Sequence, residues 1–464
     1  MTKCARQINR LRSNGVAGIA ALLLIASQVL ADGGQQLASS SHPLSLYECI
    51  SLALNESPLL EASRLDVTSA TEEARAARGE ALPKLDATAS YQLFTGSPTN
   101  KFAVVGTTGT VGIGTSKTVE EGAIELYSAH LSYPLFRDGS IMGLNTAPAE
   151  AEKLAKKRDL AWTSKLRREE VIERITTAYI TTVSAENRAG YAARRVTLLE
   201  KQVAITDEQQ KQGLMLPIDL KVAKSQLSGA RTLATILRQQ AVAGRIELAR
   251  DLGYESESRL NLSNELPDPP EPPTAEQLLG PGLTQHPQLQ VQQAVIEQAR
   301  QDYRLEHFRL YPSVTLDGSA VHIDDFGTSG AEVYLGAVNV NVPIFDFGAQ
   351  MSTTRAKLAK YQAERARLSA VTDDLTFQIV TIYQSIYVLS QNILSLQSEV
   401  AKADRDLQVI GSQAQQGISP PLTAIEKELH LIARRDDLDG LQVRRLMLYA
   451  ELQKASGGAW KWIQ

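Results

Sequence analysis

The sequence of 464 residues predicts a mainly α-helical chain that is built from two internal repeats and supplies four membrane β-strands to a barrel shared between copies. Three observations predict this fold class. The same ordered set of short motifs occurs in both halves, long segments place apolar residues at heptad spacing, and two pairs of short runs alternate apolar with polar residues.

The first element is a pattern typical of an export signal, over residues 1–31. Basic residues precede an apolar run from Val16 to Ile25, and the segment from Val29 to Ala31 fits the small-x-small rule for signal peptidase. The apolar run is too short for a helix that spans a bilayer, and Cys4 lies before it. We therefore expect an exported chain without a helical or a lipid anchor.

The composition of the expected mature chain limits its partners. The sequence has 48 basic and 52 acidic residues, and the signal holds four of the basic ones and none of the acidic ones, so the mature chain has 44 against 52. This negative charge argues against binding to nucleic acid. Only Cys49 remains as a cysteine, which excludes an internal disulfide, so stability must come from packing or assembly.

The two repeats are predicted over residues 44–266 and 274–456, with a proline-rich linker over 267–273 and a tail over 457–464. Proline, strand-exit and glycine motifs follow in the same order in both. The first repeat holds about 20 more residues before its strand exit, and this excess lies in a glycine- and threonine-rich segment over 95–122 that reads as a long loop.

Each repeat is predicted to run helix, strand, strand, long helix, shorter helix. The elements of the first repeat are a helix over 47–80, strands over 85–94 and 124–136, and helices over 149–212 and 218–254. The elements of the second repeat are a helix over 274–310, strands over 314–323 and 333–345, and helices over 350–416 and 422–456.

The long helices carry the strongest periodicity. Alternating steps of four and three residues separate the apolar residues Leu375, Ile379, Ile382, Ile386, Leu389, Ile393 and Leu396. Each long helix would rise roughly 95–100 Å, and the shorter ones roughly half of that. Two short helices stacked end to end therefore match one long helix, which predicts a cylinder wall.

The strands are predicted to have one apolar and one polar face. We expect Ala129, Leu131, Val338 and Val340 to face lipid and Asn339 to face a lumen. A single such hairpin would rather favour a sandwich strand with one buried face. Nothing else in the chain reads as strand, and four strands cannot close a membrane barrel, so copies must pool them. Two copies give eight strands and three give twelve, and the long wall favours three.

A strand-to-helix junction is predicted once in each repeat. We expect Pro134 and Pro343 to end the donation of hydrogen bonds in the strand ladder, because proline has no N–H. Gly139 and Gly348 then permit the bend into the long helix.

The chain resembles the TolC-like family of outer-membrane efflux and secretion channels. The resemblance rests on the duplicated element order, on the strand exits Pro134-Leu135-Phe136 and Pro343-Ile344-Phe345, and on the paired turns that begin at Gly213 and Gly417. It implies a homotrimer with a 12-stranded outer-membrane barrel and a long periplasmic α-helical barrel in a Gram-negative bacterium. It also implies a periplasmic adaptor (a membrane fusion protein) and an inner-membrane pump as partners.

The function implied by the resemblance is that of a passive exit duct in a tripartite efflux or type I secretion system. The alternative is a periplasmic coiled-coil adaptor or scaffold without a channel of its own, which would leave the amphipathic hairpins without a role. The six histidines show no paired spacing, and no glycine-rich loop precedes a lysine, so we expect no enzyme, no cofactor and no metal site. The run from His322 to Asp325 offers oxygen and imidazole donors, but we favour an acidic loop tip over a cation site there.

The turns are predicted as periplasmic tips where an adaptor docks, against the alternative of ordinary helix turns. These tip residues are Gly213, Leu214, Met215, Leu216, Pro217, Gly417, Ile418, Ser419, Pro420 and Pro421. In the resemblance, Asp219 matches an acid that links the closed gate. The second tip has Ala414 and Ser419 where the family has a tyrosine and an arginine, so that lock is not carried over.

The family also has two acids that ring the pore just inside the tips. The nearer position is Thr423 here, and the further one is Glu426. A three-fold axis would bring three copies of Glu426 together and attract cations. The alternative is a solvated glutamate that pairs with Lys427 or His430.

Overall fold

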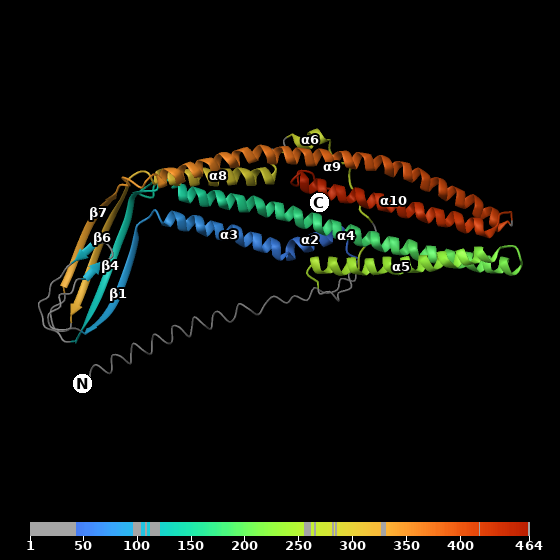
Figure 1. Cartoon of the computed structure of the whole chain (residues 1–464), viewed down its shortest axis with the longest axis horizontal. Helices are drawn as coiled ribbons and strands as arrows, with labels where there is room; N and C mark the ends of the chain where they lie inside the picture. Colours follow the sequence, from blue (N-terminus) through green and yellow to red (C-terminus); the bar gives the residue numbers. More distant parts are fainter. Residues whose placement is uncertain are drawn as a thin grey trace.

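A computed structural model describes most of the chain. The described residues are 43–95, 104–106, 109–111, 121–254, 261–263, 266–280, 283, 285–325, 331–416 and 418–462. The predicted signal over 1–31, Gly417 and most of the predicted long loop over 95–122 lie outside the described residues. The described chain is elongated, with a β-sheet at one end and helices over the rest (Figure 1).

The sheet contains four long antiparallel strands. They are β1 (Lys84–Thr95), β4 (Glu121–Arg137), β6 (Ser313–Asp325) and β7 (Ala331–Asn341), in the spatial order β1-β4-β6-β7. The two-residue β5 (Ser140–Ile141) folds back on the end of β4, and β2 (Val104–Gly106) pairs with β3 (Gly109–Val111) in a separate ribbon. Within the described residues, β1 and β7 each have a strand on one side only.

The two strand exits differ, which corrects the expectation that proline ends both ladders. The strand predicted over 333–345 stops at Asn341, two residues before Pro343. In the first repeat Pro134 lies inside β4, which continues to Arg137 across an irregularity in register between Pro134 and Phe136. A bulge allows a proline within a ladder because the residue there is not required to donate.

The leading helix of each repeat is interrupted, where a continuous helix was predicted. Residues 47–80 form α2 (Leu46–Glu56) and α3 (Pro58–Gly79), and residues 274–310 form α6 (Ala275–Leu279) and α8 (Pro287–Phe308). Both breaks precede a proline at the first helical position, where its missing N–H costs nothing and where it disfavours a helical residue before it.

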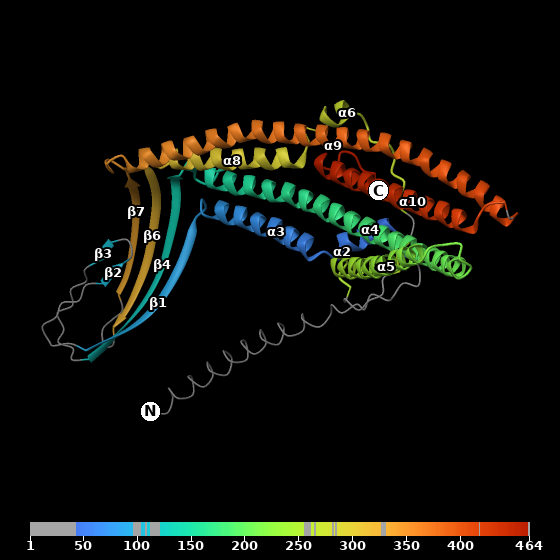
Figure 2. The ribbon, with the colours of Figure 1, turned by 45° about the vertical axis from the view of Figure 1, so that its right-hand side comes forward.

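The remaining helices form the wall. They are α4 (Pro148–Lys211), α5 (Pro217–Asp251), α9 (Ala349–Gln415) and α10 (Pro421–Ala455). The order of packing is α3-α4-α8-α9 next to the sheet and α5-α4-α10-α9 at the other end, so pairs of shorter helices lie along each long one (Figure 2). Among the described residues, α9 is long and apolar enough to cross a membrane. In its most apolar stretch of 18 residues, 33% of the residues are buried inside the protein.

The heptad seam predicted for α9 is buried from Leu375 to Ile393. Its first six residues are at most 7% exposed, and Leu396 is half-buried. Burial of such a seam stabilises helix pairs by roughly 25 cal/mol per Å2 of apolar surface.

The main core lies at mid-length, where both repeats meet and where the first and the last described segments pack. Ile175 and Tyr179 of α4 pack there with Leu248 of α5 and Leu452 of α10. The hydroxyl of Tyr179 donates to the carbonyl of Ser263 at 3.0 Å, which ties the end of the first repeat to the wall. The tail covers this core with Trp460 and Trp462, whose rings lie 5.5 and 6.2 Å from that of Tyr449.

Candidate functional site: the membrane sheet and the helix tips

The strand register gives the sheet one apolar face. Ala129 pairs with Ala87 on one side and with Ala320 on the other, and the next row joins Leu131 with Leu85 and Gly318. Because side chains alternate along a strand, residues paired across the sheet share a face. Val338 pairs with Leu316 and Val340 with Val314 on the same face. The four residues predicted to face lipid therefore lie together, and the side chains of Val338 and Val340 are 62% and 60% exposed.

The opposite face is polar and hydrogen-bonded. Asn339 donates to the carboxylate of Asp317 at 2.5 Å, and Thr315 donates to the same oxygen at 3.2 Å. The imidazole Nε2 of His130 lies 3.8 Å from the other carboxylate oxygen. Polar side chains of this kind favour contact with water, and burying them in hydrocarbon would cost free energy. The sheet therefore has one polar and one apolar face.

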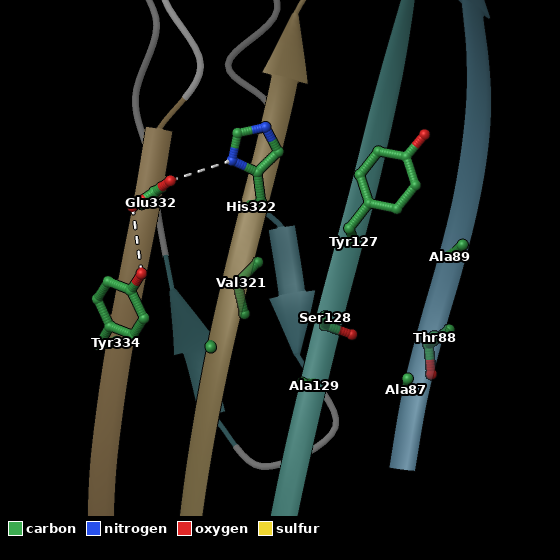
Figure 3. Close-up of a pocket in the computed structure, with 11 residues that line it drawn as sticks. Ala87, Thr88, Ala89, Tyr127, Ser128, Ala129, Val321, His322, Glu332 and Tyr334 are labelled. Atoms are coloured by element: carbon green, nitrogen blue, oxygen red, sulfur yellow. Dashed lines mark hydrogen bonds and ion pairs between the residues drawn. The ribbon is translucent and has the colours of Figure 1, made fainter.

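Aromatic and charged side chains gather at the end of the apolar face that is remote from the helices (Figure 3). The hydroxyl of Tyr334 donates to Glu332 at 3.2 Å, and the imidazole of His322 lies 3.9 Å from the other oxygen of Glu332. A shallow hollow of about 430 Å3 lies beside them, with Tyr127 on its rim and alanines on its floor. Tyrosines at the border of an apolar band are typical of the interface between lipid and water.

Both lateral edges of the chain expose apolar side chains. On α9, Val380, Tyr387 and Leu394 follow one another at seven-residue spacing, and Tyr387 and Leu394 are each 60% exposed. On α5, at the other edge, Leu233 and Ile236 are also exposed. The sequence analysis identified the buried seam of α9 but not this second one, although its heptad spacing is visible in the sequence.

The first tip is a helix stop with an apolar surface. Gly213 has a φ of 73° and follows α4, and the N–H of Leu214 donates to the carbonyl of Gln209 at 2.9 Å, which is the Schellman arrangement. Leu214 and Leu216 are 71% and 66% exposed, Met215 is half-buried, and Pro217 begins α5.

The second tip has the same pattern. The N–H of Ile418 donates to the carbonyl of Gln413 at 2.9 Å, and Ile418 is 70% exposed. Ser419 and Pro420 follow, and Pro421 begins α10. The paired turns therefore end both halves of the wall in exposed apolar groups at the end remote from the sheet (Figure 1).

The two acids predicted at the gate lie just inside these tips. The carboxylate of Asp219 accepts a hydrogen bond from the backbone N–H of Leu216 at 3.1 Å, so it helps to cap α5 while its side chain stays exposed. Glu426 is exposed on α10, and within the described residues it forms no ion pair with Lys427 or His430. Its neighbour Glu428 is the one that pairs, with Arg194 of α4.

The second strand-to-helix junction is held by a residue that the sequence analysis missed. Gly139 and Gly348 have φ values of 82° and 81°. The carboxylate of Asp346 accepts from the N–H of Gly348 at 3.0 Å and from that of Gln350 at 2.6 Å, so it caps the N-terminus of α9. An aspartate two residues before a glycine and a long helical pattern is a signal that could have identified this cap.

No group of three histidine, cysteine or acidic side chains suitable for a metal ion occurs among the residues that the structure describes. His322 lies beside Glu332, and the side chains of Asp324 and Asp325 are outside the description. Burial raises the pKa of Cys49 to about 12, so its thiol is not reactive at neutral pH.

Comparison with known proteins finds similarity to outer-membrane proteins. Residues 278–458 match the family model of the outer membrane efflux protein. The chain is 24% identical over 361 residues to the pyoverdine export outer membrane protein OpmQ of Pseudomonas aeruginosa, which covers 75% of this chain and 73% of that protein.

Solved structures share the fold of most of the chain. The outer membrane protein VceC of Vibrio cholerae superposes with a TM-score of 0.71 at 17% identity, over 90% of this chain and 97% of that one. The outer membrane channel CmeC of Campylobacter jejuni superposes with a TM-score of 0.73 at 13% identity, over 90% and 87%.

Proposed function

The chain has the fold of TolC-like outer-membrane channels, and its second repeat matches the outer membrane efflux proteins; from this premise we propose that three copies form an exit duct across the outer membrane. The duct conducts substrates passively from the periplasm to the exterior as the last part of a tripartite efflux system. The sheet crosses the membrane, and the helices form its periplasmic extension.

The observation that carries this proposal is the pair of open edges of the sheet. β1 and β7 each leave one row of backbone groups unpaired within the described residues, and a lipid-embedded sheet must satisfy every such group by closure. The edge of β7 continues into the exposed stripe of α9, and the opposite edge continues into α3 and α5. Contacts between two different edges generate a closed ring.

The number of copies follows from the size of the barrel. Two copies supply eight strands, which close around side chains, whereas three supply twelve and leave a passage. The fold of the solved channels supports the larger barrel. The mass of the purified mature protein in detergent tests this: it should be three times that of one chain, and planar bilayers should show stepwise ionic conductance. A monomer without conductance would contradict the proposal.

The partners of the duct are proposed to be a periplasmic adaptor and an inner-membrane pump. The exposed apolar residues of the tips, Leu214, Leu216 and Ile418, support a docking surface there because such groups are poorly placed in water. Cysteines introduced at Leu214 or Ile418 should cross-link to the adaptor in whole cells, and a cysteine at Leu85 in β1 of the sheet should not. Cross-linking from Leu85 alone would place the adaptor at the wrong end.

A further inference from the structure

A basic pocket at mid-length lies outside the duct and its tips. It has a volume of about 370 Å3 and lies between α2, α4 and the end of α10. Apolar side chains form part of its wall, among them Ile50, Leu54 and Ile172. Two cationic side chains, Arg168 of α4 and Lys461 of the tail, line it as well and are exposed to solvent.

The two cations of the pocket have no acidic partner within the described residues. Two basic residues close to them do pair with acids. Arg167 lies 3.2 Å from Glu170, and Lys454 lies 2.7 Å from Glu173. Arg168 and Lys461 therefore leave a local positive charge on a chain that is acidic as a whole.

A buried amide forms part of the wall of the pocket. Gln453 of α10 lines the pocket and is 2% exposed. Its Nε2 donates to the carboxylate of Glu169 at 3.3 Å, and its Oε1 has no hydrogen-bond partner among the described residues.

The carboxylate of Glu169 fixes the orientation of this amide. A carboxylate accepts hydrogen bonds, so it holds the NH2 group of Gln453 and leaves the carbonyl oxygen on the other side. A buried acceptor without a donor is costly, roughly 1–3 kcal/mol. Glu169 is itself only 8% exposed, which keeps the arrangement rigid. The carbonyl oxygen is itself enclosed, so the pocket offers a ligand its apolar wall and the two cations.

We propose that this pocket binds an acidic peptide segment of a periplasmic partner. An aspartate or glutamate side chain of the segment pairs with Arg168 and Lys461. An apolar neighbour in the segment packs on Ile50, Leu54 and Ile172. The site lies away from both the sheet and the tips, so the proposal goes beyond the duct itself and does not depend on it.

The test uses the full mature protein in detergent and two capped dipeptides. The probe is N-acetyl-Leu-Asp amide, and its matched control is N-acetyl-Leu-Asn amide, which has the same shape without the charge. Calorimetric titration at low salt should show saturable binding of the acidic peptide and roughly tenfold weaker binding of the control, since a charge-assisted bond contributes about 1.5–3 kcal/mol.

Variants then assign the binding to the pocket. Arg168→Gln and Lys461→Gln should each lower the affinity of the protein for the acidic peptide roughly tenfold without lowering its unfolding temperature. Arg167→Gln is the control, because Arg167 is adjacent and exposed but pairs with Glu170. The proposal is overturned by equal affinity for the two peptides, by absence of saturable binding, or by an equal effect of Arg167→Gln. Conductance is unaffected in every case, so failure here is distinct from failure of the duct.

Discussion

At the scale of single residues, Asp439 places an ionisable group in the wall between α10 and α4. Burial, and then the charge of Asp436, raise the pKa of the Asp439 carboxyl, against hydrogen bonds from Tyr191 and Asn187 that lower it. The folded chain therefore holds this proton more tightly than the unfolded chain. The stability that the neutral acid contributes is present at low pH and is lost as pH rises from the usual aspartate range through the raised pKa.

We expect Asp439→Asn to remove the loss of folding stability that accompanies ionisation of Asp439, because the amide keeps an acceptor for Tyr191 without a charge. The variant should unfold at a higher temperature than the parent at pH 7, and the difference should vanish near pH 3.5, below the usual pKa of an aspartate of about 3.9. Thermal unfolding at both values is the measurement. An equal difference at the two values would show that ionisation plays no part.

Glu426 is the second residue with a distinct consequence. It is exposed and unpaired within the described residues, so three copies around an axis would present three carboxylates to a pore. Glu426→Gln should reduce cation selectivity and block by divalent cations in single-channel recordings. Lys427→Gln, at the adjacent position, is the control. Unchanged selectivity in the Glu426 variant would place this side chain on the outer surface.

At the scale of elements, the joint between α8 and the end of α10 is tightly packed. Gly457 has a φ of 62°, and a Cβ there would clash with Cδ of Pro287. Next to it, Nε2 of His286 donates to the carbonyl of Ala455 at 3.0 Å, and its Nδ1 accepts from Gln288.

Gly457→Ala should therefore destabilise the fold more than Gly213→Ala. Gly213 has a similar φ of 73° but has nothing within 4 Å of its Cβ position. The free energy of unfolding of the control, Gly213→Ala, should fall by about 1 kcal/mol from backbone strain alone. That of Gly457→Ala should fall by several kcal/mol. Denaturant unfolding of both variants compares them. Equal losses would mean that α8 and the tail move apart without cost.

The sheet provides a second test at this scale, because neighbouring residues of β7 have opposite faces. The substitution Val338→Arg should lower the stability of the inserted fold by about 2–4 kcal/mol if that face contacts lipid near the midplane of the bilayer. An arginine at Asn339 should cost much less, since Asp317 is 2.5 Å away as a partner. Refolding into lipid vesicles, followed by heat-modifiable migration, measures both. Equal tolerance of the two variants would reverse or remove the membrane assignment.

At the scale of the whole molecule, the exposed stripe of α9 should join one copy to the next. We expect the double substitution Tyr387→Glu with Leu394→Glu to release monomers, because it places two charges in an apolar contact. Ser385→Glu adds the same charge to the same helix beside the buried seam and should leave the assembly intact. Native mass measurement distinguishes them. An assembly that survives the double substitution would exclude this edge from the contact.

The sequence by itself determined the periodic features of this protein. Steps of three and four residues located the seam from Leu375 to Ile393, alternation located all four strands and separated Val338 from Asn339, and paired motifs showed the duplication. The glycines at the tips were visible because a helix stop has local chemistry. Local patterns suffice for features that depend on neighbours along the chain.

Only the tertiary structure decided what depends on segments far apart in sequence. The strand order left β1 and β7 as the open edges, and packing made one stripe of α9 buried and another exposed. The basic pocket joins Tyr47, Arg168 and Lys461 from three distant segments, which no local pattern brings together. Long-range packing sets these contacts, because the same amphipathic helix can bury its face against several partners, and only the complete fold selects one.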